Sequence, residues 1–281
     1  MATLILHNNT LNFEQIKVIE HTFGQQGKPV KINNHYRIEL NETPSPELVQ
    51  KLANEIMIDI NLLPSDFNAK EIKLVISDMD STLISIECVD EIADYINVKP
   101  EVSAITEAAM RGELNFEESL IKRVALLKGL DTSALQYVYS DRLTLNPGAE
   151  KWISGLHERN IKFALVSGGF TFFTDRLKKE LNLDFSRANV LGEENGELTG
   201  EVIGGIIGAQ AKAYFLHELC DDLNIKPSQV IAVGDGANDL VMMKEAGLSV
   251  AYHAKPAVQQ QAATALNHAG LDAILDFIED N

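Results

Sequence analysis

The sequence predicts an α/β fold in which a Rossmann-like parallel sheet carries a helical cap, preceded by a small α+β unit of ferredoxin-like order. Three short runs rich in β-branched residues, KLVIS (73–77), KFALVS (162–167) and QVIAVG (229–234), each end at a polar position. Nearly all-apolar strands of this kind are typical of a parallel sheet that helices cover on both faces. Residues 88–142 show helical spacing only, and the first 70 residues follow a different order of elements.

Length and composition exclude several classes of protein. The chain has 281 residues, of which 45% are hydrophobic and 23% charged, as in an ordinary globular protein and unlike a disordered one. Its formal net charge of −17 repels polyanions, so we expect no nucleic-acid partner. No apolar stretch approaches the length of a membrane span, and no basic segment precedes the apolar run at the N-terminus, so we expect neither a membrane partner nor a secretory signal. A phosphorylated substrate would need concentrated positive charge at its site.

The two cysteines, Cys88 and Cys220, are far apart and match no metal-ligand spacing. A disulfide framework is therefore not expected, and the reducing cytoplasm is the default location. Cys88 is more easily explained as a buried structural thiol than as a nucleophile.

Residues 1–70 are expected to form an accessory unit. Its predicted elements are a strand at 3–8, a helix at 12–24, a hairpin at 29–40 that turns at Asn33-Asn34, a helix at 46–57 and a strand at 58–63. This β-α-β-β-α-β order is ferredoxin-like. Residues 64–70, PSDFNAK, are expected to link the unit to a second domain at 71–281.

Within 71–281, a helical cap is expected at about 85–145, directly after the first strand. Its predicted helices lie around 88–97, 100–111, 115–127 and 131–142. An insertion at this place would hang over the strand ends and act as a lid. Further on, residues 189–203 are expected to form a hairpin around Asn195-Gly196.

The three polar strand ends should meet, because ligands of open α/β sheets gather at the carboxyl ends of the strands. The first strand ends in Asp78-Met79-Asp80. Two carboxylates two residues apart can serve as a nucleophile and as a general acid and base. The alternative is a polar loop without chemistry.

The other two strand ends and one lysine indicate a phosphate and a metal ion. Ser167-Gly168-Gly169 offers a hydroxyl and backbone N–H groups that can hold an anion, although a tight strand–helix turn uses the same residues. Residues 234–239, GDGAND, are dense in oxygen ligands that suit Mg²⁺, and Asp239 could instead anchor the following helix. Lys212 stands alone among small apolar residues; a solvated helix lysine is its ordinary explanation, and a bridge between phosphate and carboxylate is the functional one.

Taken together, these residues resemble a known family. DMDST (78–82), SGG (167–169), Lys212 and GDGAND (234–239), in this order and spacing, are similar to the four motifs of the haloacid dehalogenase superfamily of phosphohydrolases. The stretches ECVDE (87–91) and MRGELNFEESL (110–120) resemble the cap of its phosphoserine phosphatase family. The resemblance covers roughly residues 72–280.

The resemblance implies Mg²⁺-dependent hydrolysis of O-phospho-L-serine to L-serine and phosphate, the last step of serine biosynthesis. Asp78 would attack phosphorus and become an aspartyl phosphate. Asp80 would protonate the departing serine oxygen and then activate water. Ser167, the Gly168 amide and Lys212 would bind the phosphate, because phosphoryl transfer depends on positioning and charge stabilisation.

The resemblance also implies a metal site. Asp78, the backbone carbonyl of Asp80 and Asp235 would hold Mg²⁺. Asn238, which would also contact the substrate, and Asp239 would support the site.

Cap residues would select the substrate by the same resemblance. Glu87 would pair with the ammonium group of phosphoserine and Arg123 with its carboxylate, which a guanidinium can bind in a bidentate manner. Met110 and Phe116 would supply apolar walls that exclude water when the cap closes. Without the resemblance, Glu87 and Arg123 are more simply explained as surface charges on cap helices.

Other functions stay open. The first 70 residues resemble ACT domains, which often bind amino acids, but they carry no ligand-binding motif, so a stabilising unit or a homodimer contact fits equally well. The catalytic residues also fit a phosphotransferase that uses another alcohol, such as homoserine. A signalling module that stores a phosphorylated Asp78 is disfavoured by Asp80, which would speed hydrolysis of the acyl phosphate.

Overall fold

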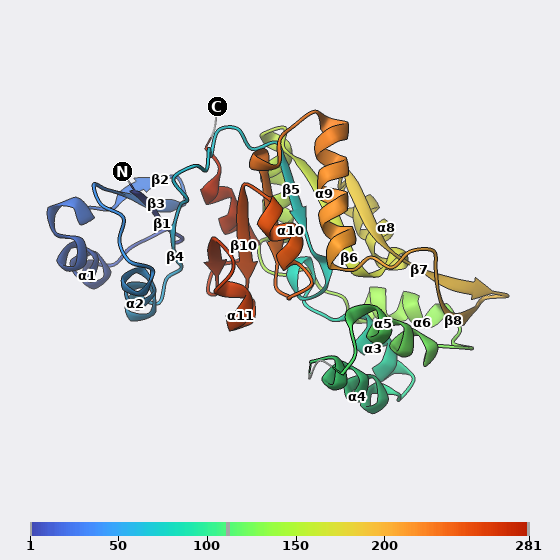
Figure 1. The fold of residues 1–281 in the computed structure, drawn as a ribbon. Helices are drawn as coiled ribbons and strands as arrows, with labels where there is room; N and C mark the ends of the chain where they lie inside the picture. The colour runs from blue at the N-terminus through green and yellow to red at the C-terminus, as the bar shows by residue number, and fades with distance from the viewer. Residues whose placement is uncertain (1, 111–112, 280–281) are drawn as a thin grey trace.

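The computed structural model describes residues 2–110 and 113–279. The chain forms a small N-terminal unit, a central sheet between layers of helices, and a group of cap helices, one after another in space (Figure 1). This arrangement confirms the predicted fold class. Among the described residues, no helix is both long enough and apolar enough to cross a membrane.

The N-terminal unit is a four-stranded antiparallel sheet with two helices. Its elements are β1 (Ala2–Leu6), α1 (Phe13–Phe23), the 3-10 turn Gly24–Gly27, β2 (Val30–Ile32), β3 (His35–Leu40), α2 (Pro46–Ile56) and β4 (Ile60–Leu62), with the strands in the order β2-β3-β1-β4. The helices begin where the local sequence supplies caps. Asn12 and Gln15 form a reciprocal capping box at α1, and Ser45 accepts the N–H of Leu48 before α2.

Strand β1 joins two hydrophobic cores because its side chains alternate between the two faces of the small sheet. Leu4 and Leu6 pack with the helices of the N-terminal unit, whereas Ile5 packs with the core of the larger domain. Strand β1 therefore contributes packed side chains on both faces of the small sheet.

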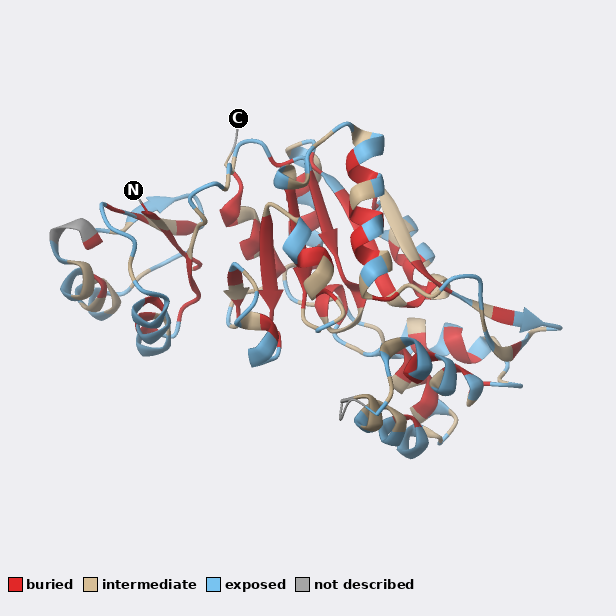
Figure 2. Cartoon of the chain, in the orientation of Figure 1, coloured by how far each residue is buried: buried red, intermediate tan, exposed pale blue. Residues whose placement is uncertain are grey.

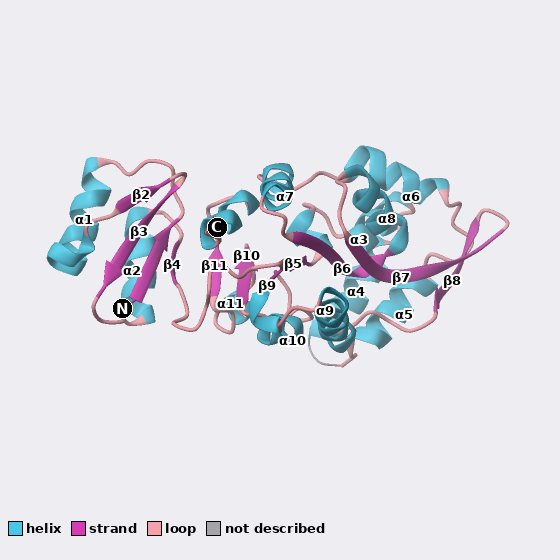
Figure 3. Cartoon of the chain, turned by 90° about the horizontal axis from the view of Figure 1, so that it is seen from above, coloured by secondary structure: helices cyan, strands magenta, loops and turns pink. Residues whose placement is uncertain are grey.

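The N-terminal unit also covers β11 (Thr264–Leu266), an edge strand of the larger sheet, beside which β4 lies (Figure 3). The side-chain amide of Asn61 donates to the carbonyl of Ala265 at 2.9 Å and accepts its N–H at 2.8 Å. The carboxylate of Asp59 accepts three backbone N–H groups, those of residues 267–269, at 2.8–2.9 Å. These bonds satisfy groups that an open sheet edge would leave unpaired.

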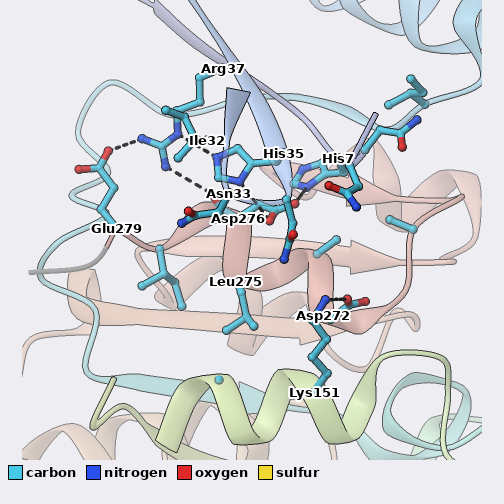
Figure 4. A pocket seen from close by; sticks show the side chains of 18 of the residues that line it. His7, Ile32, Asn33, His35, Arg37, Lys151, Asp272, Leu275, Asp276 and Glu279 are labelled. Atoms are coloured by element: carbon cyan, nitrogen blue, oxygen red, sulfur yellow. Dashed lines mark hydrogen bonds and ion pairs between the residues drawn. The ribbon is translucent and has the colours of Figure 1, made fainter. Parts of the chain in front are cut away.

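A cavity of about 1050 Å³ lies between the N-terminal unit and the larger domain (Figure 4). Three sets of interacting side chains line it: His7 and His35 with Asp276, Arg37 with Glu279, and Lys151 with Asp272. The two histidine ring nitrogens lie 2.9 and 3.1 Å from the Asp276 carboxylate oxygens. Because basic and acidic side chains both line the cavity, it presents no single sign of charge.

The larger sheet has seven strands in the order β11-β10-β9-β5-β6-β7-β8, all parallel to their neighbours except β8. The remaining strands are β5 (Leu74–Ser77), β6 (Lys162–Phe170), β7 (Phe185–Glu194), β8 (Glu197–Ile203), β9 (Val230–Gly234) and β10 (Leu248–Tyr252). The helices are α7 (Ala149–Glu158), α8 (Thr171–Glu180), α9 (Ala209–Leu223), α10 (Leu240–Glu245) and α11 (Pro256–Gln259), with 3-10 turns at Pro227–Gln229 and Leu271–Phe277. The three predicted strands form as β5, β6 and β9, and 189–203 forms the β7–β8 hairpin.

Helices cover both faces of this sheet, as its apolar strands predict. Leu74 and Ile76 of β5 belong to one core, with α9 and α10, while Val75 belongs to the opposite core, with α7 and α8. Figure 2 shows the buried residues concentrated on these central strands and on the helix faces turned toward them.

The cap follows β5 and lies at the carboxyl ends of the parallel strands (Figure 1). It consists of α3 (Cys88–Tyr95), α4 (Lys99–Met110), α5 (Phe116–Ala125), α6 (Ser133–Tyr137) and the turn Val138–Arg142. The β7–β8 hairpin reaches the cap, where the N–H of Gly129 donates to Leu198 and the N–H of Leu198 donates to Leu130, both at 2.8 Å. These two hydrogen bonds attach the cap to the sheet besides its covalent ends.

Candidate active site

The site begins at Asp78, the first residue after β5. Its N–H donates to the carbonyl of Val233 on β9, so the β5–β9 ladder holds Asp78 at the tip of the strand. Its carboxylate accepts the N–H of Met79 at 2.7 Å and lies 2.7 Å from the ammonium of Lys212. Strands β6 to β8 extend the sheet on one side of β5, and strands β9 to β11 extend it on the other, so the strand order reverses beside β5. Asp78 therefore lies where folds of this kind bind ligands.

Asp80 reaches the same place through the turn Met79–Leu83, in which Ser81 adopts a left-handed conformation with φ of 56°. One carboxylate oxygen of Asp80 accepts the N–H of Cys88 at 2.9 Å, and the other accepts the hydroxyl of Ser167 at 3.2 Å. Burial raises the pKa of Asp80, against the opposing effect of these hydrogen bonds. An acid with a raised pKa can carry a proton near neutral pH.

Cys88 begins the first cap helix and is buried. Burial raises the pKa of its thiol well above the ordinary value, and the nearby carboxylate of Asp80 raises it further. The thiol is therefore not a reactive nucleophile, and the structural explanation expected from the sequence fits.

Lys212 lies in the first turn of α9, and its side chain is 0% exposed. Its ammonium is 2.7 Å from both Asp78 and Asp239. Burial alone would lower the pKa of Lys212, but the two carboxylates outweigh it and raise the pKa. The explanation of Lys212 as a solvated helix lysine is therefore wrong.

Three carboxylates could hold a metal ion. One oxygen each from Asp78, Asp235 and Asp239 lies within 4.8 Å of the others. Burial and the Asp239 carboxylate raise the pKa of Asp235 to about 6 and also raise that of Asp78 well above its usual value. Since Lys212 supplies one positive charge against three carboxylates, a divalent cation bound by oxygen would complete the charge balance, and the donor set suits Mg²⁺.

The carboxylates divide into ligands and supports. Both oxygens of Asp239 are engaged, one with Lys212 and the other with the N–H of Gly236 at 3.1 Å. Asp235 accepts the hydroxyl of Thr82 at 3.2 Å and lines the open cavity. The side chain of Asp80 faces Cys88 and Ser167 instead, which fits the expectation that Asp80 would offer a metal only its backbone carbonyl. Thr82 was not assigned a role from the sequence.

The two glycines near the end of β6 lie so close to neighbouring side chains that a larger residue would force those side chains to move. A Cβ on Gly168 would lie 2.7 Å from the Phe116 ring, and one on Gly169 would lie 2.7 Å from the Asp80 carboxylate. Both glycines line the cavity, whereas the hydroxyl of Ser167 is turned to Asp80 and the N–H of Gly169. Strand β6 continues to Phe170, and α8 begins at Thr171.

The cavity bounded by these groups has a volume of about 210 Å³. The sheet side is formed by Asp78, Asp80, Gly168, Gly169, residues 235–238 and Lys255, and the cap side by Glu87, Val89, Phe116, Leu120 and Arg123. Asn238 lies at this wall as expected, while Lys255, which follows β10, was missed as a site residue. The side chain of Met110, the last residue of α4, lies outside the described part of the chain.

Glu87 and Arg123 are brought together in the cavity rather than left as surface charges. Burial and the Asp80 carboxylate raise the pKa of Glu87 to about 7, and the Ser81 hydroxyl donates to it at 2.6 Å. Burial lowers the pKa of Arg123, which still stays charged because a guanidinium does not lose its proton in proteins. The cavity thus has a cation and a titratable carboxylate at its cap end and the carboxylates of Asp78, Asp80 and Asp235 at its sheet end, where the buried ammonium of Lys212 lies behind Asp78.

Comparisons with known proteins identify a family and several relatives of this chain. Residues 72–247 match the model of the haloacid dehalogenase-like hydrolases. The phosphoserine phosphatase of a Polaromonas species is 52% identical over 225 residues, which are 78% of this chain and 95% of that protein. A haloacid dehalogenase family hydrolase from Salmonella enterica serovar Typhi superposes over 100% of both chains with a TM-score of 0.90 at 32% identity. A probable phosphoserine phosphatase from Vibrio cholerae, at 36% identity, covers 99% of this chain and 86% of its own, with a TM-score of 0.85.

Proposed function

The chain belongs to the haloacid dehalogenase-like hydrolases, and on that premise we propose that it hydrolyses O-phospho-L-serine to L-serine and phosphate. The observation that carries the proposal is the cavity of about 210 Å³ with Asp78 and Asp80 at one end and Glu87 and Arg123 at the other. Phosphoserine has a phosphate at one end and an ammonium and a carboxylate at the other. The 52% identity to a phosphoserine phosphatase, which spans the cap residues, supports the same substrate.

The two ends of the cavity would receive the two ends of the substrate. Lys212 and the loop Ser167–Gly168 would bind phosphate oxygens, while Glu87 would pair with the ammonium and Arg123 with the carboxylate. Phe116, which contacts Gly168, would close the apolar side and exclude water from the phosphate.

The reaction would proceed in two displacements on phosphorus. A carboxylate oxygen of Asp78 forms a bond to phosphorus as the bond to the serine oxygen breaks, and Asp80 gives that oxygen its proton. Asp80 then takes a proton from water, whose oxygen attacks the aspartyl phosphate, so that phosphate leaves and Asp78 is restored. Mg²⁺, held by Asp78, Asp235 and the Asp80 carbonyl, would neutralise the negative charge shared by phosphate and carboxylates. Asp239 would support Lys212.

A substrate panel tests the proposal. Phosphate release should be faster from O-phospho-L-serine than from O-phosphothreonine or sugar phosphates, should stop with EDTA and should return with excess Mg²⁺. Higher activity on a sugar phosphate would contradict the substrate. Added homoserine should not yield phosphohomoserine; its formation would instead indicate a phosphotransferase.

The nucleophile can be tested separately. Asp78→Asn should abolish turnover, and rapid acid quenching of the native enzyme should place one phosphoryl group on the peptide containing Asp78. Asp272→Asn, which removes a carboxylate far from this cavity, is the matched control and should retain activity. Appreciable turnover by Asp78→Asn would remove this residue as nucleophile.

We further propose that residues 1–70 form an accessory domain on a hydrolase domain at 71–281, whose cap spans about 85–145. The Polaromonas relative supports this division, because almost all of its length matches only 78% of this chain. The strand order β2-β3-β1-β4 supports an ACT-like, ferredoxin-like accessory domain. The two cysteines are free and buried, which fits a reducing cytoplasm.

A further inference from the structure

We propose that Asn189 is a positioning residue for phosphate binding, which holds the loop Ser167–Gly169 and ties it to the segment before Lys212. This inference rests on the proposed phosphatase function. Asn189 lies on β7, is 1% exposed and does not line the cavity. Its side-chain N–H donates to the carbonyl of Gly168 at 2.8 Å, and its side-chain oxygen accepts the N–H of Ile207 at 2.8 Å.

The loop needs such a bond because it leaves the sheet. Val166 of β6 pairs with Arg187 of β7, and the next pair is Phe170 with Asn189. Three residues of β6 therefore face one residue of β7, and the segment Ser167–Gly169 bulges out of the ladder. Two of its three residues are glycines, whose backbone can rotate more freely than that of other residues.

Asn189 and Ser167 together hold the peptide group between Gly168 and Gly169 at both ends. The carbonyl of Gly168 points to Asn189, and the N–H of Gly169 donates to the Ser167 hydroxyl at 2.7 Å. A rotation of this peptide would turn a carbonyl oxygen toward Asp80 and an incoming phosphate, and like partial charges would repel. By holding this carbonyl toward β7, Asn189 keeps its oxygen away from the place where the phosphate would bind.

The other end of the Asn189 amide reaches the cation of the site. Ile207 precedes Gly208, the N-terminal cap of α9, and the N–H of Lys212 donates to the carbonyl of Gly208 at 3.0 Å. One buried amide thus links the loop that would hold the phosphate oxygens to the helix turn that presents the ammonium of Lys212. A change at Asn189 should loosen both groups without touching the cap.

Asn189→Asp tests the proposal, because aspartate has nearly the same shape and keeps an acceptor for Ile207 but removes the donor to Gly168. The variant should lose about 10–100-fold in kcat/KM for p-nitrophenyl phosphate, the range typical of residues that orient a catalytic group, and inorganic phosphate should inhibit it correspondingly less well. Inhibition by L-serine, which has no phosphate, should stay within about twofold of the native value. p-Nitrophenyl phosphate lacks the serine part, so failure of the phosphoserine proposal would not affect this test.

Asn61→Asp is the matched control. Asn61 is also a buried asparagine whose amide makes two backbone hydrogen bonds, of 2.9 and 2.8 Å, but to Ala265 at the interface with the N-terminal unit. It should lower stability while leaving phosphate inhibition within about twofold. Equal losses of phosphate inhibition in the two variants would overturn the proposal, as would an Asn189→Asp enzyme whose kcat/KM stays native at high pH, where the introduced carboxyl is ionised.

The pH dependence gives a readout that loss of packing would not change. In the Asn189→Asp enzyme, the introduced carboxyl can donate to Gly168 only when protonated, and its buried position beside a carbonyl favours that form. The activity of the variant relative to the native enzyme should therefore rise as the pH falls toward about 5. A constant ratio across the pH range would refute the role. Asn189→Ala, which cannot donate at any pH, should show no such rise; if it does not fold, the aspartate variant decides alone.

Discussion

Lys212 offers the sharpest test of the electrostatic design, because the chain contains a matched lysine elsewhere. Lys212 lies 2.7 Å from Asp78 and from Asp239 and is 0% exposed, while Lys151 lies 2.8 Å from Asp272 and is 59% exposed. The ion-pair distances are almost equal, so burial and the number of carboxylate partners are the variables that differ. Lys212→Met and Lys151→Met should therefore have very different effects on the free energy of unfolding.

Removal of the Lys212 ammonium leaves buried carboxylates without their cation, which costs about 3–5 kcal/mol when one partner of a buried pair is lost. The exposed Lys151 pair contributes about 0.2–1 kcal/mol. Urea unfolding should be followed by the fluorescence of Trp152, the single tryptophan, which is buried in the larger domain. With EDTA present and an m-value of about 3 kcal/mol/M, Lys212→Met should lower the midpoint by about 1–2 M and Lys151→Met by less than about 0.4 M.

Two conditions should reduce the loss in Lys212→Met. Mg²⁺ should restore part of the stability, because it would neutralise the same carboxylates. The loss should also shrink as the pH falls through about 6, where the raised pKa of Asp235 lets it bind a proton and lose its charge. Equal midpoints for the two lysine variants, or a loss that does not depend on pH, would refute the reasoning. In catalysis, Lys212→Met should lower kcat/KM by about 10²–10³-fold, as loss of a charge-stabilising donor does.

Three further predictions concern the cap and the interface. Arg123→Ala should lower kcat/KM for phosphoserine about 10–150-fold, which corresponds to the loss of a charge-assisted pair of about 1.5–3 kcal/mol. It should lower kcat/KM for p-nitrophenyl phosphate by less than about threefold. Equal losses for the two substrates would contradict the role of Arg123 in binding the carboxylate. The pKa of Glu87 is about 7, and only the ionised side chain attracts the ammonium group of phosphoserine, so kcat/KM for phosphoserine should rise with pH through about 7. Glu87→Gln should remove this rise. A rise that persists in Glu87→Gln would show that another group causes it. Burial raises the pKa of Asp276, but the hydrogen bonds from His35 and His7 outweigh burial and lower this pKa overall. Asp276→Asn should therefore be less stable than the native protein above about pH 4 and should approach the native stability below it. Urea unfolding of both proteins above and below about pH 4 tests this.

The parts of the site that follow strands were predictable from local patterns. Asp78, Ser167 and Asp235 each come at or directly after an apolar run, and parallel strands that alternate with helices place such ends at one edge of a sheet. The same reasoning located the cap, because its helices interrupt the alternation after β5. These inferences succeed because each depends on a short segment and on a general rule of topology.

Other residues of the site have no local signal. Lys255 follows β10, which was not among the predicted strands, so nothing placed it at the cavity. Asn189 is a single polar residue in a hairpin strand, and its importance comes from Gly168 and Ile207, which are distant in sequence. The bulge in β6 that creates the need for Asn189 is visible only as a register shift between two paired strands.

The sequence by itself determined the order of the elements, the fold class and the chemical types of the groups at the strand ends, because hydrophobic periodicity and turn residues act over a few positions. Only the tertiary structure decided the electrostatics. It buried Lys212, which the sequence alone presents as a surface lysine, between Asp78 and Asp239, and it placed Glu87 and Arg123 at a common cavity. Charge pairing and burial depend on distances between segments that lie tens to more than a hundred residues apart, and those distances exist only once the helices and the cap have packed on the sheet.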